Sequence, residues 1–271
     1  MDRHDAIREV FGAAAEGYAA STIHSGGPDL AAMIEAAELT GAERVLDLGC
    51  GTGHTALAFA QRCAEVEALD LTRQMLDAGR RMAGARGLAN VRFREGDAAE
   101  LPYPDASFDV VTSRLSAHHY TLPEQAVREA ARVLRPGGRL LWIDSVSPAG
   151  WAEDTFMNTF EILRDRSHVR NHNTDQWLAM FEGVDLAAEV LQTWSYRIDF
   201  DPWVERVATP PLEAAMLRSL FAHATDELRA AFGIASDHSF DIPAALLRGR
   251  SRSDQPRAGD AQTLQPRCKR R

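Results

Sequence analysis

Cysteine is scarce in this chain of 271 residues, which holds only Cys50, Cys63 and Cys268. The number is odd and the three lie far apart, so the sequence offers neither a disulfide framework nor a CxxC metal knuckle. This usage fits a reducing compartment, and we expect a cytoplasmic protein.

Long apolar runs are missing as well. The first residues, MDRHD, are charged and no apolar core follows them, unlike a secretory signal. No segment elsewhere approaches the roughly 20 apolar residues that cross a bilayer. We therefore expect neither secretion nor membrane insertion.

Positive charge is in deficit, because 30 Lys and Arg stand against 39 Asp and Glu, a net charge of −9. Phosphate binding needs clustered basic side chains, so nucleic acid is not an expected partner. Residues 251–271 are the exception, being basic and poor in large apolar side chains. We expect them to form a disordered basic tail.

The rest of the chain, residues 1–250, is expected to form one domain, since 45% of the residues are hydrophobic and can bury a sizeable core. Apolar runs alternate with helical patterns over residues 40–146, which predicts βαβ units and a doubly wound α/β sheet. The expected strands are 44–48, 66–70, 90–94, 108–112 and 139–144, and the expected helices are 55–63, 72–83 and 124–134.

Outside this core the pattern changes. Thr72 is expected to cap its helix, and Pro136 to Gly138 to form a turn into the fifth strand. Apolar spacing predicts helices from Trp151 to Leu163, at 174–181 and at 211–232, and strands at 186–198 and 240–247. Helices outside the sheet are expected within residues 1–30.

The strongest chemical signal is DLGCGTG at residues 47–53, between an expected strand and an expected helix. Alternate glycines let the backbone turn sharply and approach a ligand, while the helix N-terminus offers free N–H groups. In a dinucleotide-binding fingerprint the third glycine stands at the position where this chain has His54. This difference favours a ligand without a pyrophosphate; a tight turn without ligand is the alternative.

Two more acidic residues follow strand ends. Asp70 comes about twenty residues after the glycine turn and suits the two hydroxyls of a ribose. In GDAAELP at residues 96–102, the Asp97 carboxylate can accept from an adenine amine while the N–H of Ala98 reaches a ring nitrogen. Three such elements in this order indicate a nucleoside ligand.

With FDVV at 108–111 and RVLRPGG at 132–138, these motifs resemble class I S-adenosylmethionine-dependent methyltransferases, in particular the ubiquinone and menaquinone C-methyltransferase branch. The resemblance is strong over residues 40–146 and weaker at 18–24 and 164–170. It implies a seven-stranded, mainly parallel sheet of order 3-2-1-4-5-7-6 with the last strand antiparallel.

The resemblance also implies how this fold is used. Residues 40–146 would bind S-adenosyl-L-methionine, residues 1–30 would form lid helices, and residues 150–235 would hold a substrate-covering insertion and C-terminal strands. No reactive role is expected for Cys50, a half-buried thiol. The implied cofactor-binding residues are Asp47, Gly49, Gly51, Gly53, Asp70, Leu71, Asp97, Ala98, Arg114 and Tyr18.

Methyl transfer needs a base only where the acceptor atom still carries its proton. Candidates near the site are His118, His119, Asp144, Arg114, His24, His168 and Arg170. We expect His119, His118 and Asp144 to be catalytic, with His119 as the base; a structural role for the histidine pair is the alternative. His168 and His172 could share a helical face as metal ligands, but no third ligand is apparent and no metal is expected.

The expected acceptor is a small, largely apolar, aromatic or conjugated molecule methylated at carbon or oxygen, under a lid from residues 1–30 and 150–175. A nucleotide-binding oxidoreductase and a non-catalytic cofactor sensor or scaffold are the alternatives. A homodimer is compatible with the sequence. The aromatic residues expected to be mostly core are Trp142, Trp151, Phe156, Phe160, Trp177 and Phe181.

Overall fold

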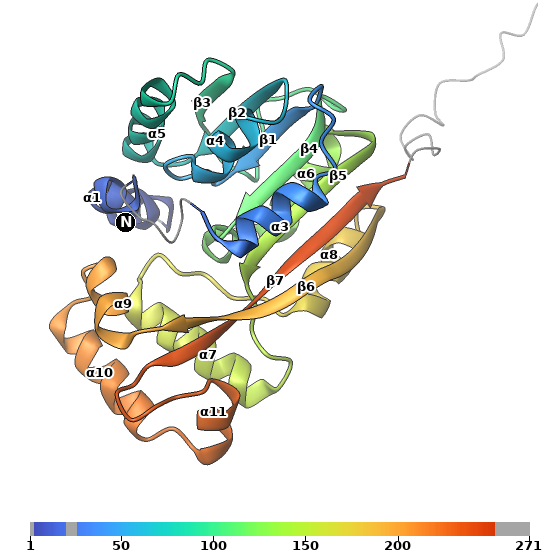
Figure 1. The fold of residues 1–271 in the computed structure, drawn as a ribbon. Coiled ribbons are helices and arrows are strands. Elements are labelled where there is room, and N and C mark those ends of the chain that lie inside the picture. The colour runs from blue at the N-terminus through green and yellow to red at the C-terminus, as the bar shows by residue number, and fades with distance from the viewer. Residues whose placement is uncertain (1–2, 20–25, 253–271) are drawn as a thin grey trace, which may run out of the picture.

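One seven-stranded sheet organises the chain (Figure 1). The computed structural model describes residues 3–19 and 26–252. Strands β1 to β5 run parallel, whereas β7 is antiparallel to both of its neighbours in the order β3-β2-β1-β4-β5-β7-β6. The predicted sheet is therefore confirmed. The strands are β1 Arg44–Leu48, β2 Glu65–Asp70, β3 Val91–Glu95, β4 Phe108–Arg114, β5 Leu134–Ser145, β6 Leu186–Ile198 and β7 Phe240–Ser251.

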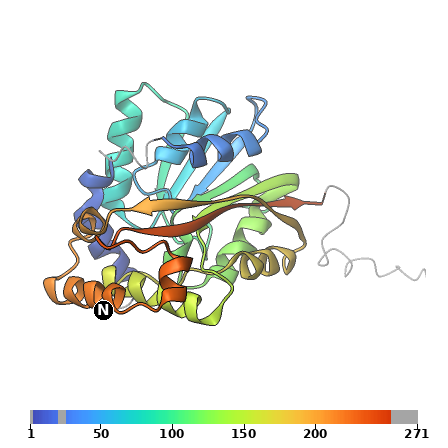
Figure 2. The same ribbon diagram turned by 60° about the horizontal axis from the view of Figure 1, so that its bottom comes forward.

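Helices flank both faces of this sheet, as Figure 2 shows along its edge. The helices are α1 Arg3–Ala19, α3 Pro28–Ala36, α4 His54–Ala60, α5 Arg73–Ala85, α6 Pro123–Val133, α7 Trp151–Arg164, α8 Thr174–Glu182, α9 Phe200–Arg206, α10 Pro211–Ala222 and α11 Asp226–Ala231, with the short 3-10 helix η1 Ala117–His119. None of them, within the described part of the chain, is long and apolar enough to cross a membrane.

Successive side chains of a strand point to opposite faces of the sheet, and helices cover both faces, so both sets of side chains are buried. Leu46 and Leu48 pack with α6 and α8, whereas Val45 packs with α3 and α4. The same alternation continues in β5, where Trp142 belongs to the first cluster and Ile143 to the second. Strands covered on both faces explain the near-continuous apolar runs in the sequence.

A third apolar cluster lies beyond this core, under the long β6–β7 ribbon in Figure 1. It joins α7, α9 and α10 to the start of β7, with Phe160, Trp203, Phe221 and Phe240 all buried. The predicted helix at 211–232 is wrong in this region, since α10 ends at Ala222 and α11 begins after it. Thr225 causes the break, because its hydroxyl accepts from Leu228 N and caps the new helix.

Three other expectations need correction. Trp151 is 92% exposed, because it begins α7 at the surface. The expected tail does not begin at residue 251, because Ser251 is still part of β7 and pairs with Leu186 of β6. Residues 253–271 lie outside the described residues. Thr72 precedes α5 as predicted, yet its hydroxyl makes no capping bond.

The predicted turn at residues 136–138 is an irregularity within β5. Gly137 has φ +77°, a conformation that favours glycine. The pairing of β5 with β4 shifts at this point, between Phe108 and Val110. The strand therefore begins before the expected turn and resumes after it.

Candidate active site

The glycine turn between β1 and α4 has a left-handed backbone at Gly49, Gly51 and Gly53. A Cβ on Gly49 would lie 2.6 Å from Ser116 Oγ, and one on Gly53 would lie 2.8 Å from the ring of Phe93. A Cβ on Gly51 would meet nothing within 4 Å. Two of the glycines are thus required for packing, and Gly51 presents its backbone to open space.

Asp70 at the end of β2 braces this turn. Gly51 N donates to Asp70 Oδ2 and Thr72 N donates to Asp70 Oδ1, both at 2.8 Å. Burial raises the pKa of Asp70, although these two hydrogen bonds oppose the shift. Each carboxylate oxygen keeps a second lone pair for a ligand.

A cavity of about 500 Å³ opens beside the turn, within the size range of small-molecule sites. It brings together most of the residues expected to bind the cofactor: Tyr18, Gly49, Gly51, Asp70, Leu71, Asp97, Ala98 and Arg114. Asp47 and Gly53 do not line it. Asp47 lies fully buried below, where burial raises its pKa to about 7 even though Thr112 Oγ1 donates to it at 2.8 Å.

Helix α1 covers one side of this cavity with Ile7, Phe11 and Tyr18. His54 Nε2 donates to the Tyr18 carbonyl at 2.9 Å and so ties α1 to the glycine turn. Arg3 ties its other end to the His168 carbonyl at 2.9 Å. Only α1 serves as a cover among the described residues of the predicted 1–30 lid, because α3 packs against the sheet.

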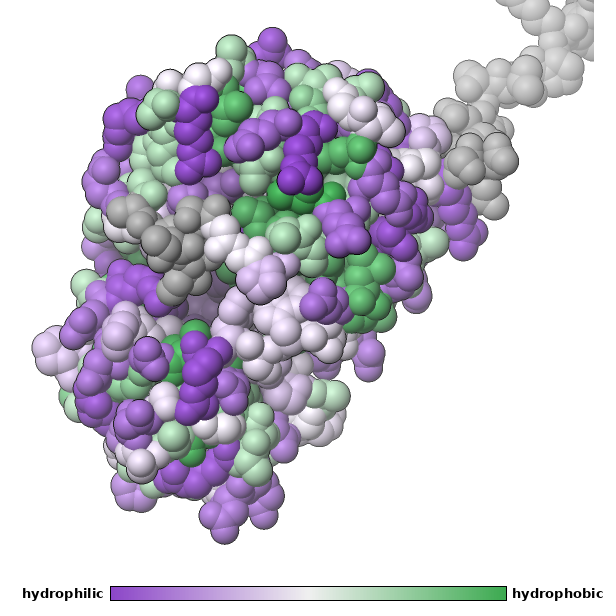
Figure 3. Space-filling model, in the orientation of Figure 1, coloured by the Kyte–Doolittle hydropathy of each residue, from purple (hydrophilic) through white to green (hydrophobic). Residues whose placement is uncertain are grey.

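The opposite wall comes partly from the predicted 150–175 segment, through Glu161, Arg164 and Asp165. Other wall residues come from β6 and α9, and the motif spacing did not indicate that these two elements line the cavity. The described wall residues from these two elements and from the junction between them are Tyr196, Arg197, Ile198, Asp199, Pro202, Trp203 and Arg206. Figure 3 shows this face hollowed between the part that carries α4 and α5 and the part that carries α9 and α10.

His118 lies where β4 and β5 end, and it lines the cavity. Its Nδ1 is 2.6 Å from Asp144 Oδ1, and its backbone N donates to Asp144 Oδ2 at 2.9 Å. Asp144 is fully buried and does not line the cavity itself. Burial lowers the pKa of His118, but the charge and hydrogen bond of Asp144 raise it, and the net shift is upward.

The adjacent His119 has a different environment. Its Nδ1 donates to the Ser167 carbonyl at 3.1 Å, and Phe11 packs edge-on against its ring. Burial and the positive charge of His118 lower the pKa of His119 to about 4. His119 is therefore neutral near pH 7 and a weak base.

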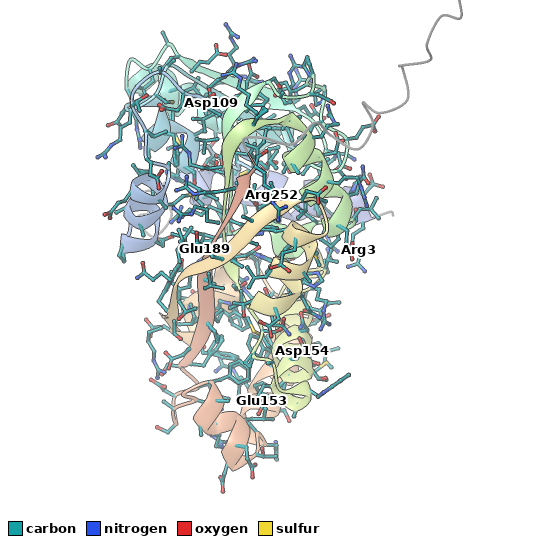
Figure 4. The ribbon with its side chains drawn as sticks, turned by 90° about the vertical axis from the view of Figure 1, so that its right-hand side faces the viewer. Arg3, Asp109, Glu153, Asp154, Glu189 and Arg252 are labelled. Carbon is teal, nitrogen blue, oxygen red and sulfur yellow. The ribbon has the colours of Figure 1, made fainter. Side chains whose placement is uncertain are left out.

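Three further candidates, His168, His172 and Arg170, do not line the cavity. His168 and His172 lie in the loop after α7, so the proposed shared helical face is wrong. Burial holds the pKa of His168 far below its usual value, and its Nε2 donates to Asn158. Arg170 donates to Asp154 in the first turn of α7, labelled in Figure 4. His24 lies outside the described residues.

Arg114 reaches the cavity but its charge is already compensated. Its guanidinium donates to Asp29 Oδ2 through Nε at 2.7 Å and Nη2 at 2.6 Å. The Tyr196 hydroxyl donates to the same oxygen at 3.1 Å. This buried pair holds α3 against the sheet, a role that the position of Arg114 at a strand end did not indicate.

Comparisons with known proteins agree with this geometry. A family described as methyltransferase domain matches residues 46–142. The uncharacterized methyltransferase YcgJ of Bacillus subtilis is 40% identical over 247 residues, covering 89% of this chain and 98% of the relative. This chain is a class I S-adenosylmethionine-dependent methyltransferase.

The fold comparison supports the same membership. The crystal structure of YcgJ has a TM-score of 0.81 to this methyltransferase, covering 83% of this chain and 98% of YcgJ. A demethylmenaquinone methyltransferase from Deinococcus radiodurans is 41% identical over 156 residues, covering 55% of this chain and 64% of the relative. The family match contains the glycine turn, Asp70, Asp97 and His118 but ends before α7 and α9.

Proposed function

We propose that this protein transfers the methyl group of S-adenosyl-L-methionine to the carbon or oxygen of a small, largely apolar, aromatic or conjugated acceptor. The observation that carries the proposal is the single cavity that joins the glycine turn and two strand-end carboxylates to His118. Ile7, Phe11 and Trp203 provide its apolar surface.

The donor groups fit a nucleoside cofactor. Asp70 pairs with Glu95 across β2 and β3, which places Asp70 and Asp97 on neighbouring strand ends. In the proposal Asp70 accepts from the ribose hydroxyls, Asp97 and the Ala98 N–H bind the adenine, and the open backbone at Gly51 holds the methionine end. When bound, the cofactor supplies a methyl group on a positively charged sulfonium.

His118 is the base in this proposal, with Asp144 orienting it. The Asp144 carboxylate fixes the proton on His118 Nδ1, so Nε2 keeps its lone pair. No described residue bonds to Nε2, which leaves it to take a proton from an acceptor hydroxyl or activated carbon. The pKa of His118, raised by Asp144, suits a base better than the low pKa of His119.

The proposal also includes a lid over the cavity, formed by the elements that cover it. Helix α1 and the α7–α9 side enclose the cavity, which excludes water and orients the acceptor behind the methyl carbon. The relatives named for demethylmenaquinone and ubiquinone/menaquinone methylation support an oxygenated aromatic ring as the acceptor core.

Turnover is tested by supplying S-adenosylmethionine with a panel of hydroxylated naphthalenes and measuring S-adenosylhomocysteine by mass spectrometry. The proposal expects product with at least one reduced naphthoquinone or naphthol, and about 10²–10⁴-fold slower product formation with His118→Ala at matched concentration. Product formed equally by wild type and His118→Ala would remove the base from the proposal.

A further inference from the structure

Four arginines line the cavity, and their charges are compensated unequally. Three have an acidic side chain within ion-pair distance: Arg114 with Asp29 at 2.6 Å, Arg197 with Asp241 at 3.4 Å and Arg164 with Glu161 at 3.8 Å. Arg206, at the end of α9, has no such partner among the described residues. Since it lines the cavity and is also exposed, it lies where the cavity opens.

Arg206 lines the same cavity as a second cation, Arg164. Partial desolvation and the positive charge of Arg164 lower the pKa of Arg206. Both guanidinium groups oppose the rise in the pKa of the buried Tyr18 hydroxyl caused by burial, whereas the carboxylates of Asp165 and Glu161 add to that rise. Two cations that line one cavity repel each other, and an anion that contacts both relieves the repulsion.

Asp165 also lines the cavity, but no ion pair joins it to Arg206 among the described residues. Its Oδ1 accepts from Ser167 N at 2.8 Å and from Ser167 Oγ at 2.6 Å, which turns it toward the loop after α7. Its charge also supports His119 on the other side. Arg206 therefore lines the cavity without an ion-pair partner among the described residues.

Arg164 is held in position by an aromatic residue. Its guanidinium lies 4.9 Å over the ring of the buried Trp203, and its Nε donates to the Trp203 carbonyl at 3.1 Å. Ile198 lines the same wall. A cavity wall that combines apolar side chains with two cations matches a ligand with a flat apolar part and a negative group.

Resting on the proposed methyl transfer, we propose that Arg206 and Arg164 bind a carboxylate of the acceptor, which makes the acceptor an aromatic or conjugated carboxylic acid. Guanidinium groups bind carboxylates through paired N–H bonds with defined geometry. The subsite would hold one end of the acceptor at this wall and determine which end faces His118.

The test compares 2-naphthoate with its neutral analogue 2-naphthamide by calorimetric titration, with and without S-adenosylhomocysteine. Wild type is expected to bind the carboxylate roughly tenfold or more tightly than the amide, as for one charge-assisted contact. Arg206→Gln should remove that preference while leaving amide and S-adenosylhomocysteine affinities unchanged. Arg128→Gln, which removes the same charge on the exposed face of α6, should change none of them.

Equal affinity of wild type for the two probes, or no binding of 2-naphthoate, would overturn the inference. An equal loss of affinity for 2-naphthoate and 2-naphthamide in Arg206→Gln would also overturn it. Tenfold weaker S-adenosylhomocysteine binding in Arg206→Gln would instead assign the anion to the cofactor's own carboxylate. Failure of wild type to bind S-adenosylhomocysteine would contradict the proposed function. The titrations of 2-naphthoate and 2-naphthamide without S-adenosylhomocysteine test the carboxylate subsite separately.

Discussion

His118 Nδ1 and Asp144 Oδ1 lie 2.6 Å apart where β4 and β5 end side by side. Asp144 is fully buried, whereas His118 reaches the cavity. A buried carboxylate behind a partly accessible imidazole fixes the tautomer of the ring and supports positive charge on it when it accepts a proton. The pair therefore has the arrangement of a base and its orienting group.

Replacement of His118 by Ala is expected to lower kcat by about 10²–10⁴-fold, the range for loss of general base catalysis. S-adenosylhomocysteine affinity should stay within twofold, because His118 is placed on the acceptor side. Steady-state kinetics and calorimetry measure the two effects. His119→Ala is the matched control, and the low basicity of His119 predicts a smaller loss of kcat; the reverse order would assign the base to His119.

The pH dependence follows from the upward shift of the His118 pKa. The base is active when deprotonated, so the rate should rise with pH through a value above about 6.5 and then level off. Asp144→Asn removes the charge that raises this pKa, so the midpoint should move to lower pH while the maximal rate falls. An unchanged midpoint in Asp144→Asn would show that another group controls the profile.

Much of the fold was accessible from sequence because its signals are local. The apolar runs of β1, β2, β4 and β5 reflect burial on both faces, Asp70 ends β2, and Asp97 comes shortly after β3. The order of the seven strands came through the family resemblance. These features need only neighbouring residues or a shared motif to be seen.

The acceptor side was less accessible because it depends on long-range packing. Trp203 and Arg206 reach the cavity only because the 13-residue β6 carries α9 past the other strands. The choice between His118 and His119 depends on how η1 turns its side chains, which adjacent positions in sequence do not reveal. The partner of Arg114 is Asp29, 85 residues away.

That buried pair predicts a stability effect. Asp29→Ala would leave the Arg114 guanidinium uncompensated in the interior, which costs about 3–5 kcal/mol of unfolding free energy. Chemical denaturation should show the loss, accompanied by a lower melting temperature. The exposed pair Arg80–Asp77 provides the control, and Asp77→Ala should cost less than about 1 kcal/mol. Similar losses in both variants would contradict a special role for the buried pair.

The central claim is that the cavity at the glycine turn binds the nucleoside cofactor, and calorimetric titration with S-adenosylhomocysteine tests it most directly. Wild type should bind one equivalent, and Asp70→Ala should bind more weakly by about 1.5–3 kcal/mol, the value of hydrogen bonds to a charged group. The fold of Asp70→Ala is checked by circular dichroism, since Asp70 also braces Gly51. Equal affinity of wild type and a folded Asp70→Ala, or no binding by wild type, would contradict the account.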